Sequence, residues 1–143
     1  MVVNVSDYIR HSAMESPLLM SAYVGEMPIP DNSAKVKYPY LNVDTIKCKR
    51  DEYSKWYTFR LYFCDRNDDY IAYSKCEQLT IQLMSKLEIT DYEYNFFRND
   101  FQDNVHGTWL DITLQVDNDC YELPNYEFTN LTYTIENGVY IRK

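Results

Sequence analysis

The residues best suited to bind a cation are Asp65, Asn67 and Asp69, which alternate along one acidic segment. The alternation matches the first half of a calcium-binding loop, in which oxygens at every second position ligate the ion. The match ends there, because the sixth position is Tyr70 where the loop needs glycine, and the twelfth is Cys76 where it needs a bidentate glutamate. We therefore expect a solvated loop and no metal site.

Cysteine and histidine are the other residue types with chemical potential, and the chain has Cys48, Cys64, Cys76, Cys120, His11 and His106. No two cysteines form a C-x-x-C pair, and neither histidine stands at ligand spacing to a cysteine, so the pattern does not predict zinc. We interpret the cysteines as reduced thiols of the core. Residues 104–107 are Asn-Val-His-Gly, which we interpret as a turn that contains His106.

Catalytic motifs are absent from the sequence. With only Gly25, Gly107 and Gly138, neither a dinucleotide-binding nor a phosphate-binding glycine loop can be written. No G-x-S-x-G or H-E-x-x-H motif occurs either. We expect no enzymatic activity and no cofactor, although residues that converge only in the fold leave an enzyme open as an alternative.

The charge of the chain argues against tight nucleic-acid binding. The net charge is −8, from 22 acidic and 14 basic residues. The one basic cluster, at 47–50, is followed at once by Asp51 and Glu52, whereas a phosphate-binding surface needs clustered lysine and arginine. No run approaches the roughly 20 apolar residues of a membrane span, and residues 1–8 lack the regions of a signal peptide. We expect synthesis in a cytoplasm and no membrane contact.

Two segments predict the strands on which the core depends. In residues 109–116, Leu110, Ile112, Leu114 and Val116 alternate with polar residues, which puts the aliphatic side chains on one face of an antiparallel strand. Residues 55–64 show the same period, with Tyr57, Phe59, Leu61 and Phe63 on one face. We expect these two apolar faces to meet and to form a large part of the core.

Two helices are expected. Residues 4–14 have Asn4 as an N-cap and Val5, Tyr8 and Ile9 on one side. Residues 74–88 begin with Ser74-Lys75-Cys76-Glu77, which has the form of a capping box. Leucines at spacings of three and four then give this second helix an apolar stripe for the core.

Weaker patterns suggest further strands. Residues 18–24 and 37–47 are short β-like runs, and residues 49–52 read as a charged turn. Residues 90–103 alternate until Phe97 breaks the period, which suggests a bulge or a bend at that residue.

The last part of the chain, 126–143, predicts a β-hairpin. Asn137-Gly138 lies between two β-rich runs, which is the strongest short-range signal for a two-residue hairpin loop. Because an isolated hairpin is marginally stable in water, this one must pack on something. We weigh its own sheet edge against a neighbouring subunit and favour the neighbour. The candidate interface residues are Tyr126, Phe128, Tyr133, Ile135, Val139, Tyr140 and Ile141.

Several segments form a recognisable combination: Tyr38-Pro39, the aromatic strand of residues 59–65 with a helix after it, Arg98-Asn99-Asp100-Phe101-Gln102-Asp103, Gly107-Thr108-Trp109-Leu110-Asp111-Ile112, Cys120 and Pro124. In these segments, and over about residues 20–124, the sequence resembles a family of tail and neck structural proteins of crAss-like and related Bacteroidetes phages. The glycine-x-tryptophan-x-aspartate strand followed by Cys120 and Pro124 is the strongest part of this resemblance. These are features of a fold and not of a catalytic site.

The resemblance implies a ring-forming virion subunit, like a tail terminator or a connector, at the head–tail junction or in the tail. Its partners would be copies of itself and neighbouring neck, portal-adaptor or tail proteins, and genome DNA would pass nearby without tight binding. The fifteen tyrosines fit this reading, because tyrosine is enriched at protein–protein interfaces, but they also fit strands. A non-viral intracellular protein-binding module without catalysis is the alternative.

We therefore predict an α+β fold with an antiparallel-rich sheet of four to five strands, helices on one face, and a C-terminal β-hairpin. Residues 1–124 would form the tail-terminator-like core, and residues 125–143 a hairpin extension.

Overall fold

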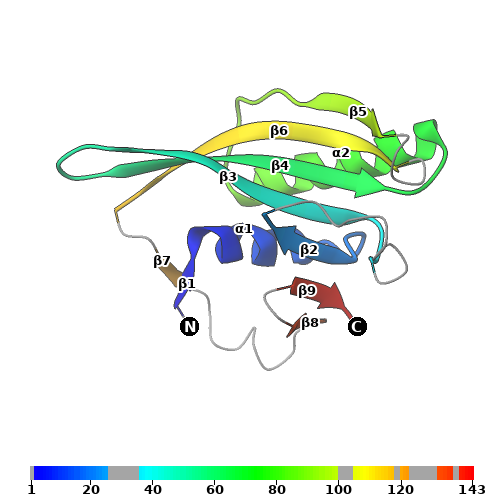
Figure 1. Cartoon of the computed structure of the whole chain (residues 1–143), viewed down its shortest axis with the longest axis horizontal. Helices are drawn as coiled ribbons and strands as arrows, with labels where there is room; N and C mark the ends of the chain where they lie inside the picture. Colours follow the sequence, from blue (N-terminus) through cyan, green and yellow to red (C-terminus); the bar gives the residue numbers. More distant parts are fainter. Residues whose placement is uncertain (1, 26–35, 100–104, 118–119, 123–131, 137–138) are drawn as a thin grey trace.

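The structure, a computed structural model, describes residues 2–25, 36–99, 105–117, 120–122, 132–136 and 139–143 (Figure 1). The elements are, in chain order, β1 (Val2–Asn4), α1 (Val5–Met14), β2 (Ser21–Val24), β3 (Tyr40–Arg50), β4 (Lys55–Asp65), α2 (Asp69–Lys86), β5 (Asn95–Asn99), β6 (Val105–Val116), β7 (Cys120–Glu122), β8 (Tyr133–Glu136) and β9 (Val139–Arg142). The fold class is α+β.

Seven of the described strands form one curled mixed sheet in the order β5-β6-β4-β3-β2-β9-β8. The pair β2–β3 is parallel and the other pairs are antiparallel, while β1 and β7 form a separate two-stranded sheet. The expected count of four to five strands is too low. The difference comes from the C-terminal hairpin, because β9 pairs with β2 and thereby adds two strands to the main sheet.

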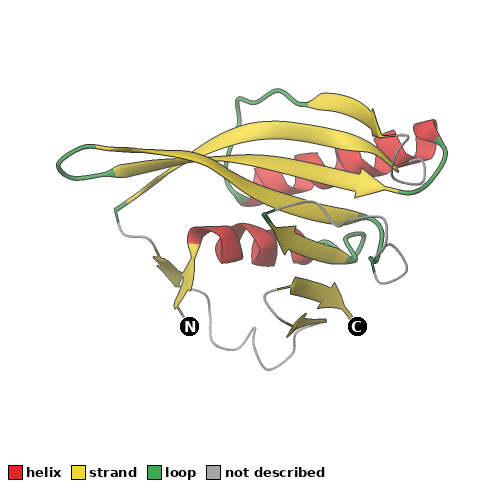
Figure 2. Ribbon diagram, viewed as in Figure 1, coloured by secondary structure: helices red, strands yellow, loops and turns green. Residues whose placement is uncertain are grey.

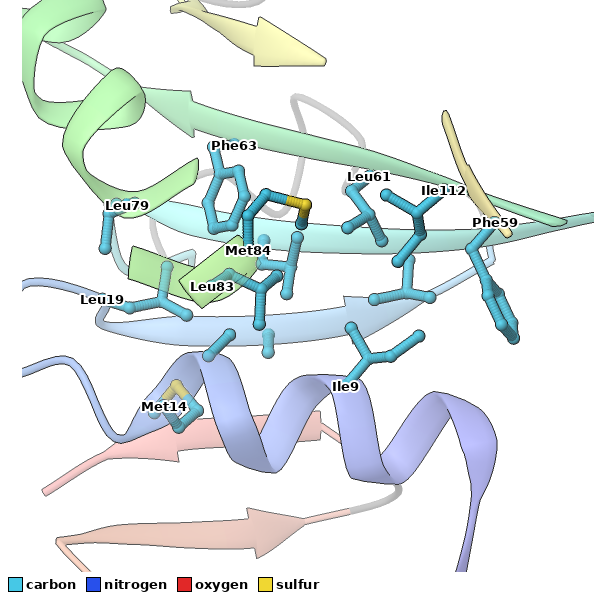
Figure 3. Close-up of a cluster of buried hydrophobic side chains, with 14 of the residues drawn as sticks. Ile9, Met14, Leu19, Phe59, Leu61, Phe63, Leu79, Leu83, Met84 and Ile112 are labelled. Atoms are coloured by element: carbon cyan, nitrogen blue, oxygen red, sulfur yellow. The ribbon is translucent and has the colours of Figure 1, made fainter. Parts of the chain in front are cut away.

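The core lies between one face of the sheet and the two helices. Figure 2 shows α2 running behind β4 and β6, and α1 packs near β2 and β3. The side chains that meet there include Ile9, Met14, Leu19, Phe59, Leu61, Phe63, Leu79, Leu83, Met84 and Ile112 (Figure 3). Each such side chain contributes about 1.5–3 kcal/mol when fully buried, so this cluster is the main stabilising element of the fold.

Strands β4 and β6 pair as their alternation predicts. Phe59 lies opposite Ile112, and Leu61 lies opposite Leu110, so the aromatic and aliphatic faces share one side of the sheet. All four side chains are buried. Strand β6 is an interior strand with β4 on one side and β5 on the other.

The predicted turn at 104–107 is wrong for the three residues of it that the structure describes. Val105, His106 and Gly107 lie within β6, and Gly107 pairs with Cys64 of β4. A Cβ atom at position 107 would lie 1.8 Å from the carbonyl oxygen of Phe63. Glycine therefore serves the close approach of two strands here and does not mark a turn.

Helix α1 begins as predicted, and α2 does not. The side chain of Asn4 accepts a hydrogen bond from the backbone N–H of Asp7 at 2.8 Å, which is the expected N-cap. Helix α2 begins at Asp69, five residues before Ser74, which is an exposed residue inside the helix. The capping box is thus wrong, because residues 69–73 continue the helix upstream and the N-cap is Asp68.

The remaining strands differ from expectation in length and irregularity. Strand β3 extends to Arg50, so the charged turn begins at Asp51, whose Oδ1 accepts from the backbone N–H groups of Tyr53 and Ser54. In the described part of the expected strand 90–103, residues 95–99 form β5, and residues 100–103 lie outside the described residues. Strand β5 pairs with β6 without a register shift, so the expected bulge at Phe97 is wrong. The irregularity of the sheet lies instead in β3, between Thr45 and Lys47. No helix among the described residues is long and apolar enough to cross a membrane.

Candidate interaction surface

The candidate interface residues of the hairpin lie on the chain's own core and sheet edge. Tyr133 and Tyr140 are buried with the main hydrophobic cluster, and Val139 and Ile141 are half-buried. Ile135 is 44% exposed. Tyr126 and Phe128 lie outside the described residues. The expectation that the hairpin packs on a neighbouring subunit in preference to its own sheet edge is therefore wrong, because β9 pairs with β2 of the same chain and β8 pairs with β9.

Helix α1 holds the hairpin through buried polar contacts. The hydroxyl of Tyr133 forms a hydrogen bond with Nδ1 of His11. The rings of Tyr133 and Tyr140 stack with their centroids 5.3 Å apart, and the guanidinium of Arg10 lies 4.6 Å from the centroid of the Tyr140 ring. Burial, together with the nearby carboxylate of Asp7, raises the pKa of Tyr140 to about 12. The contacts of His11 with Tyr133 and of Arg10 with Tyr140 join segments more than 120 residues apart in the sequence.

Arg142 gives the hairpin a second attachment. Its guanidinium donates to the backbone carbonyl oxygens of Met14, Ser16 and Leu19 at 2.5, 2.8 and 2.7 Å. Two of these carbonyls lie at and just beyond the end of α1, where helical carbonyls lack partners within the helix. Burial lowers the pKa of Arg142. This arginine thus attaches the hairpin to the rest of the fold.

His106 lies in a buried polar cluster at the start of α2. Its Nε2 atom lies 2.7 Å from Oδ1 of Asp69, although the contact lacks the geometry of a hydrogen bond. The ring of Tyr73 packs against it edge to face, with centroids 5.7 Å apart. Cys76 contacts the backbone carbonyl of His106 and not its ring, and burial raises the pKa of this thiol. A protonated, buried thiol is not an activated nucleophile, so we interpret the cluster as structural.

The acidic residues of segment 65–69 make contacts within the fold. Asp65 is buried, and its Oδ2 atom accepts from the side-chain nitrogen of Asn67 at 2.6 Å and lies 3.5 Å from Nζ of Lys75. Asp69 faces His106 instead of joining Asp65. Among the described residues, no three histidine, cysteine, aspartate or glutamate side chains are grouped so that they could hold a metal ion.

The sheet face opposite the helices is rich in aromatic and polar side chains. On it, Arg60 donates to both carboxylate oxygens of Asp111, at 2.8 and 3.1 Å, and lies 4.8 Å from the ring of Trp109. The hydrogen bonds to Asp111 raise the pKa of Arg60. The pair is half exposed, so it orders the surface without adding much stability. Sequence reasoning missed this pair, because Arg60 and Asp111 meet only through the strand register.

An aromatic cluster around Tyr40 lies at one end of this face. Tyr40 is buried between Cys64 and Val105, and Tyr23, Tyr38, Tyr62 and Phe97 pack around it. Burial raises the pKa of Tyr40. Many of the tyrosines thus pack within the chain itself, in two clusters on opposite faces of the sheet.

The larger surface grooves among the described residues include two of interest. One, of about 500 Å³, lies beside β5 and is lined by Asp91, Tyr92, Glu93, Asn95, Trp109 and Asp111. The other, of about 830 Å³, lies where the end of α1 meets α2. An ion pair between Glu15 and Lys86 crosses the second groove, as does a 2.6 Å hydrogen bond from the Ser16 hydroxyl to Oε1 of Gln82. We therefore interpret this groove as part of the contact between the two helices.

The two ends of the main sheet are β5 and β8, and no other described strand pairs with their outer sides. Each carries one large apolar side chain that is substantially exposed, Phe96 at 50% and Ile135 at 44%. Ile135 belongs to the predicted interface residues, whereas Phe96 does not. No protein-family model and no curated protein matches this sequence.

Proposed function

We propose that this chain is a structural subunit of a bacteriophage virion, which forms a ring at the head–tail junction or in the tail, in the manner of a tail terminator or connector. The proposal begins from the resemblance of residues 20–124 to tail and neck proteins of crAss-like and related phages. Its partners are other copies of the chain and adjacent neck, portal-adaptor or tail proteins.

The observation that carries the proposal is the open sheet. Its two end strands, β5 and β8, lie at opposite sides of the molecule (Figure 1), and each leaves an outer edge to which no described strand is paired. Exposed strand edges invite pairing with another chain, and two different edges on one subunit permit a head-to-tail contact. Head-to-tail contacts close into rings when the rotation between copies divides a full turn.

The chemistry around the candidate sites favours assembly over catalysis. His106 and Asp69 make contact, but the thiol beside them is buried and held protonated. The net charge of −8 suits a subunit near the path of the genome, because like charge reduces retention of DNA.

Electron microscopy and sedimentation of the purified protein test this proposal. We expect closed rings whose mass is a multiple of the 17.2 kDa chain, alone or with the neighbouring virion proteins. Labelled antibodies should locate the chain at the head–tail junction or tail of purified particles. A chain that is absent from particles, or that enters them only as a single copy, would contradict the proposal.

A protein-binding module is the second candidate function, and the groove lined by Trp109, Tyr92 and three carboxylates favours it. Aromatic rings beside carboxylates suit a lysine or arginine side chain of a partner. Under this reading the protein stays monomeric and binds a basic peptide, and Trp109→Ala abolishes binding. Rings that persist in Trp109→Ala favour the virion subunit.

A further inference from the structure

We propose that β8 of one copy pairs with β5 of the next copy as adjacent antiparallel strands, with Ile135 directly opposite Phe96. The inference rests on the ring proposed above and names the surfaces that join its subunits. The occupant of each edge is thus a second copy of this chain. Strand direction, the direction of the backbone groups and the side chains each support this pairing.

Strand direction fixes the sense of the pairing. From β3, the antiparallel partners β4, β6 and β5 alternate in direction, so β5 runs opposite to β3. On the other side β2 is parallel to β3, and β9 and β8 alternate again, so β8 runs the same way as β3. Strands β5 and β8 therefore run in opposite directions. Rotation about an axis near the strand direction preserves direction and face, so the contact between copies is antiparallel.

The backbone groups of Ile135 point away from β9. Lys143 N–H donates to the carbonyl oxygen of Thr132 at 3.0 Å, so these two residues form a hydrogen-bonded pair. Hydrogen-bonded and non-hydrogen-bonded pairs alternate along an antiparallel ladder, which makes Thr134–Ile141 the next bonded pair. Ile135, between Thr134 and Glu136, thus directs its N–H and C=O outward.

The same alternation can be followed from β3 to β6. Asp51 N–H donates to the carbonyl oxygen of Ser54 at 3.0 Å across the β3–β4 turn. The even-numbered residues of β4 therefore bond to β3, and the odd-numbered ones bond to β6. The carbonyl oxygen of Phe63 agrees with this assignment, because it lies 1.8 Å from where a Cβ of Gly107 would be and so points toward β6.

Phe96 occupies the matching position on β5. The residue opposite Phe96 on β6 is Thr108. Thr108 is paired with the odd-numbered Phe63 of β4, so its backbone hydrogen bonds go to β4 and not to β5. The bonded pairs between β5 and β6 are therefore the odd-numbered ones, such as Phe97–Gly107. The N–H and C=O of Phe96 then face the open side of β5, as those of Ile135 face the open side of β8.

The side chains fit the same register. Ile135 lies opposite Tyr140, and Phe96 lies opposite Thr108, and both of these partners face the helices. Ile135 and Phe96 therefore share the helix side of the joined sheet. As a hydrogen-bonded pair they would exchange two backbone hydrogen bonds, with Cα atoms about 5.5 Å apart. An aromatic and a β-branched side chain directly opposite each other is a favourable cross-strand pair, and the contact covers two apolar side chains that are half exposed in the monomer.

Proline variants test the edges. Ile135→Pro and Phe96→Pro each remove an outward N–H and leave the internal ladder intact, while Ile135→Ala and Phe96→Ala shorten the side chain and keep the N–H. We expect each proline variant alone to sediment as a monomer, with at most a smaller loss of assembly in the alanine variants. An equimolar mixture of the two proline variants retains one intact β8 and one intact β5, so it should form a species of twice the 17.2 kDa chain and nothing larger. Rings formed by either proline variant would overturn the inference.

Disulfide trapping gives a second test that does not depend on proline tolerance. In a background with the exposed Cys48 and Cys120 changed to serine, Phe96→Cys plus Ile135→Cys should yield covalent multimers on mild oxidation. Either cysteine alone should yield none. Crosslinked dimers from one single variant would show a two-fold contact, β5 to β5 or β8 to β8, and would overturn the inference.

The results separate this inference from the function on which it rests. Rings in the wild type that persist in both proline variants, with no crosslinking, would reject the β5–β8 contact and leave the virion subunit standing. A wild-type chain that stays monomeric with its virion neighbours would reject both.

Discussion

The guanidinium of Arg142 donates a hydrogen bond to the backbone carbonyl oxygen of Ser16 at 2.8 Å, so the last strand of the chain is attached to the end of its first helix. The same side chain reaches Leu19, and Tyr133 reaches His11. The C-terminal hairpin is therefore part of the subunit, and the first prediction follows from this attachment.

Deleting residues 126–143 should abolish cooperative folding. The deletion removes Tyr133 and Tyr140 from the core, and each buried aromatic side chain contributes about 3–5 kcal/mol relative to alanine. A domain of this size has only about 5–15 kcal/mol to lose. Circular dichroism during heating tests this. A truncated chain that melts in one sharp transition would show that the hairpin is dispensable for folding.

Arg142→Met should destabilise the fold by about 2–4 kcal/mol, because it leaves three backbone carbonyl groups without their charged donor. Arg60→Met is the matched control. Its arginine pairs with Asp111 on an exposed face, where an ion pair contributes only about 0–1 kcal/mol. Urea unfolding of both variants measures the difference. Equal losses of unfolding free energy in the two variants would mean that the hydrogen bonds of Arg142 contribute little to stability.

Gly107→Ala should cost about 3 kcal/mol or more, since the new Cβ would overlap the carbonyl oxygen of Phe63 and force β4 and β6 apart. Gly25→Ala is the comparison. Gly25 has a φ of 88° with nothing within 4 Å of its Cβ position, so the cost there is the backbone strain of about 1–2 kcal/mol. The order of the two melting temperatures checks the prediction.

Stability should fall as the pH rises above about 9. Burial raises the pKa of the Cys64 thiol from 9.0 to about 12, so the folded chain keeps a proton that the unfolded chain releases. The stabilisation from this proton is complete below pH 9 and is lost as the pH rises toward 12; at pH 10 the loss is about 1 kcal/mol. Urea unfolding between pH 8 and 10.5 measures it, and Cys64→Ala should make the slope shallower. An unchanged slope in that variant would assign the effect to other groups whose pKa burial raises, such as Cys76 and Tyr140.

Binding to duplex DNA should be weak or undetectable at about 0.15 M salt. The net charge of −8 gives no surplus of cations to replace counterions on phosphate. Fluorescence anisotropy with a labelled duplex tests this, with the same titration at low salt as the comparison. A micromolar or tighter complex at 0.15 M salt would contradict the prediction.

The parts of the fold that the sequence predicts are those in which one pattern dominates locally. Strict alternation predicts β4 and β6, and Asn4 predicts the start of α1. Prediction fails where the same residue type is common in two different local structures. Gly107 has the composition of a turn residue but serves a close strand contact, and Ser74 has the form of a cap but lies inside a helix whose preceding residues are also helix-compatible.

The candidate interaction surface is harder to predict from sequence patterns, because it depends on which strands end the sheet. Asn137-Gly138 predicts that β8 and β9 pair, and they do. Nothing local indicates that β9 docks on β2, which is only four residues long and already pairs with β3. Ile135 is among the predicted interface residues by its apolar type, and Phe96 becomes a candidate only once β5 is known to end the sheet.

The place of β9 beside β2 also governs when the subunit can fold during synthesis. Strand β2 is made early, but its antiparallel partner comes with the last residues of the chain. At about 5–20 residues per second, a ribosome needs roughly 6–25 seconds to pass from β2 to β9. For that interval the edge of β2 and the hairpin-facing side of α1 lack their native partners, and contacts of such long sequence separation form slowly. The completed sheet, and with it the outer edge of β8, exists only once β9 has left the ribosome, so the proposed pairing through that edge cannot precede the synthesis of β9.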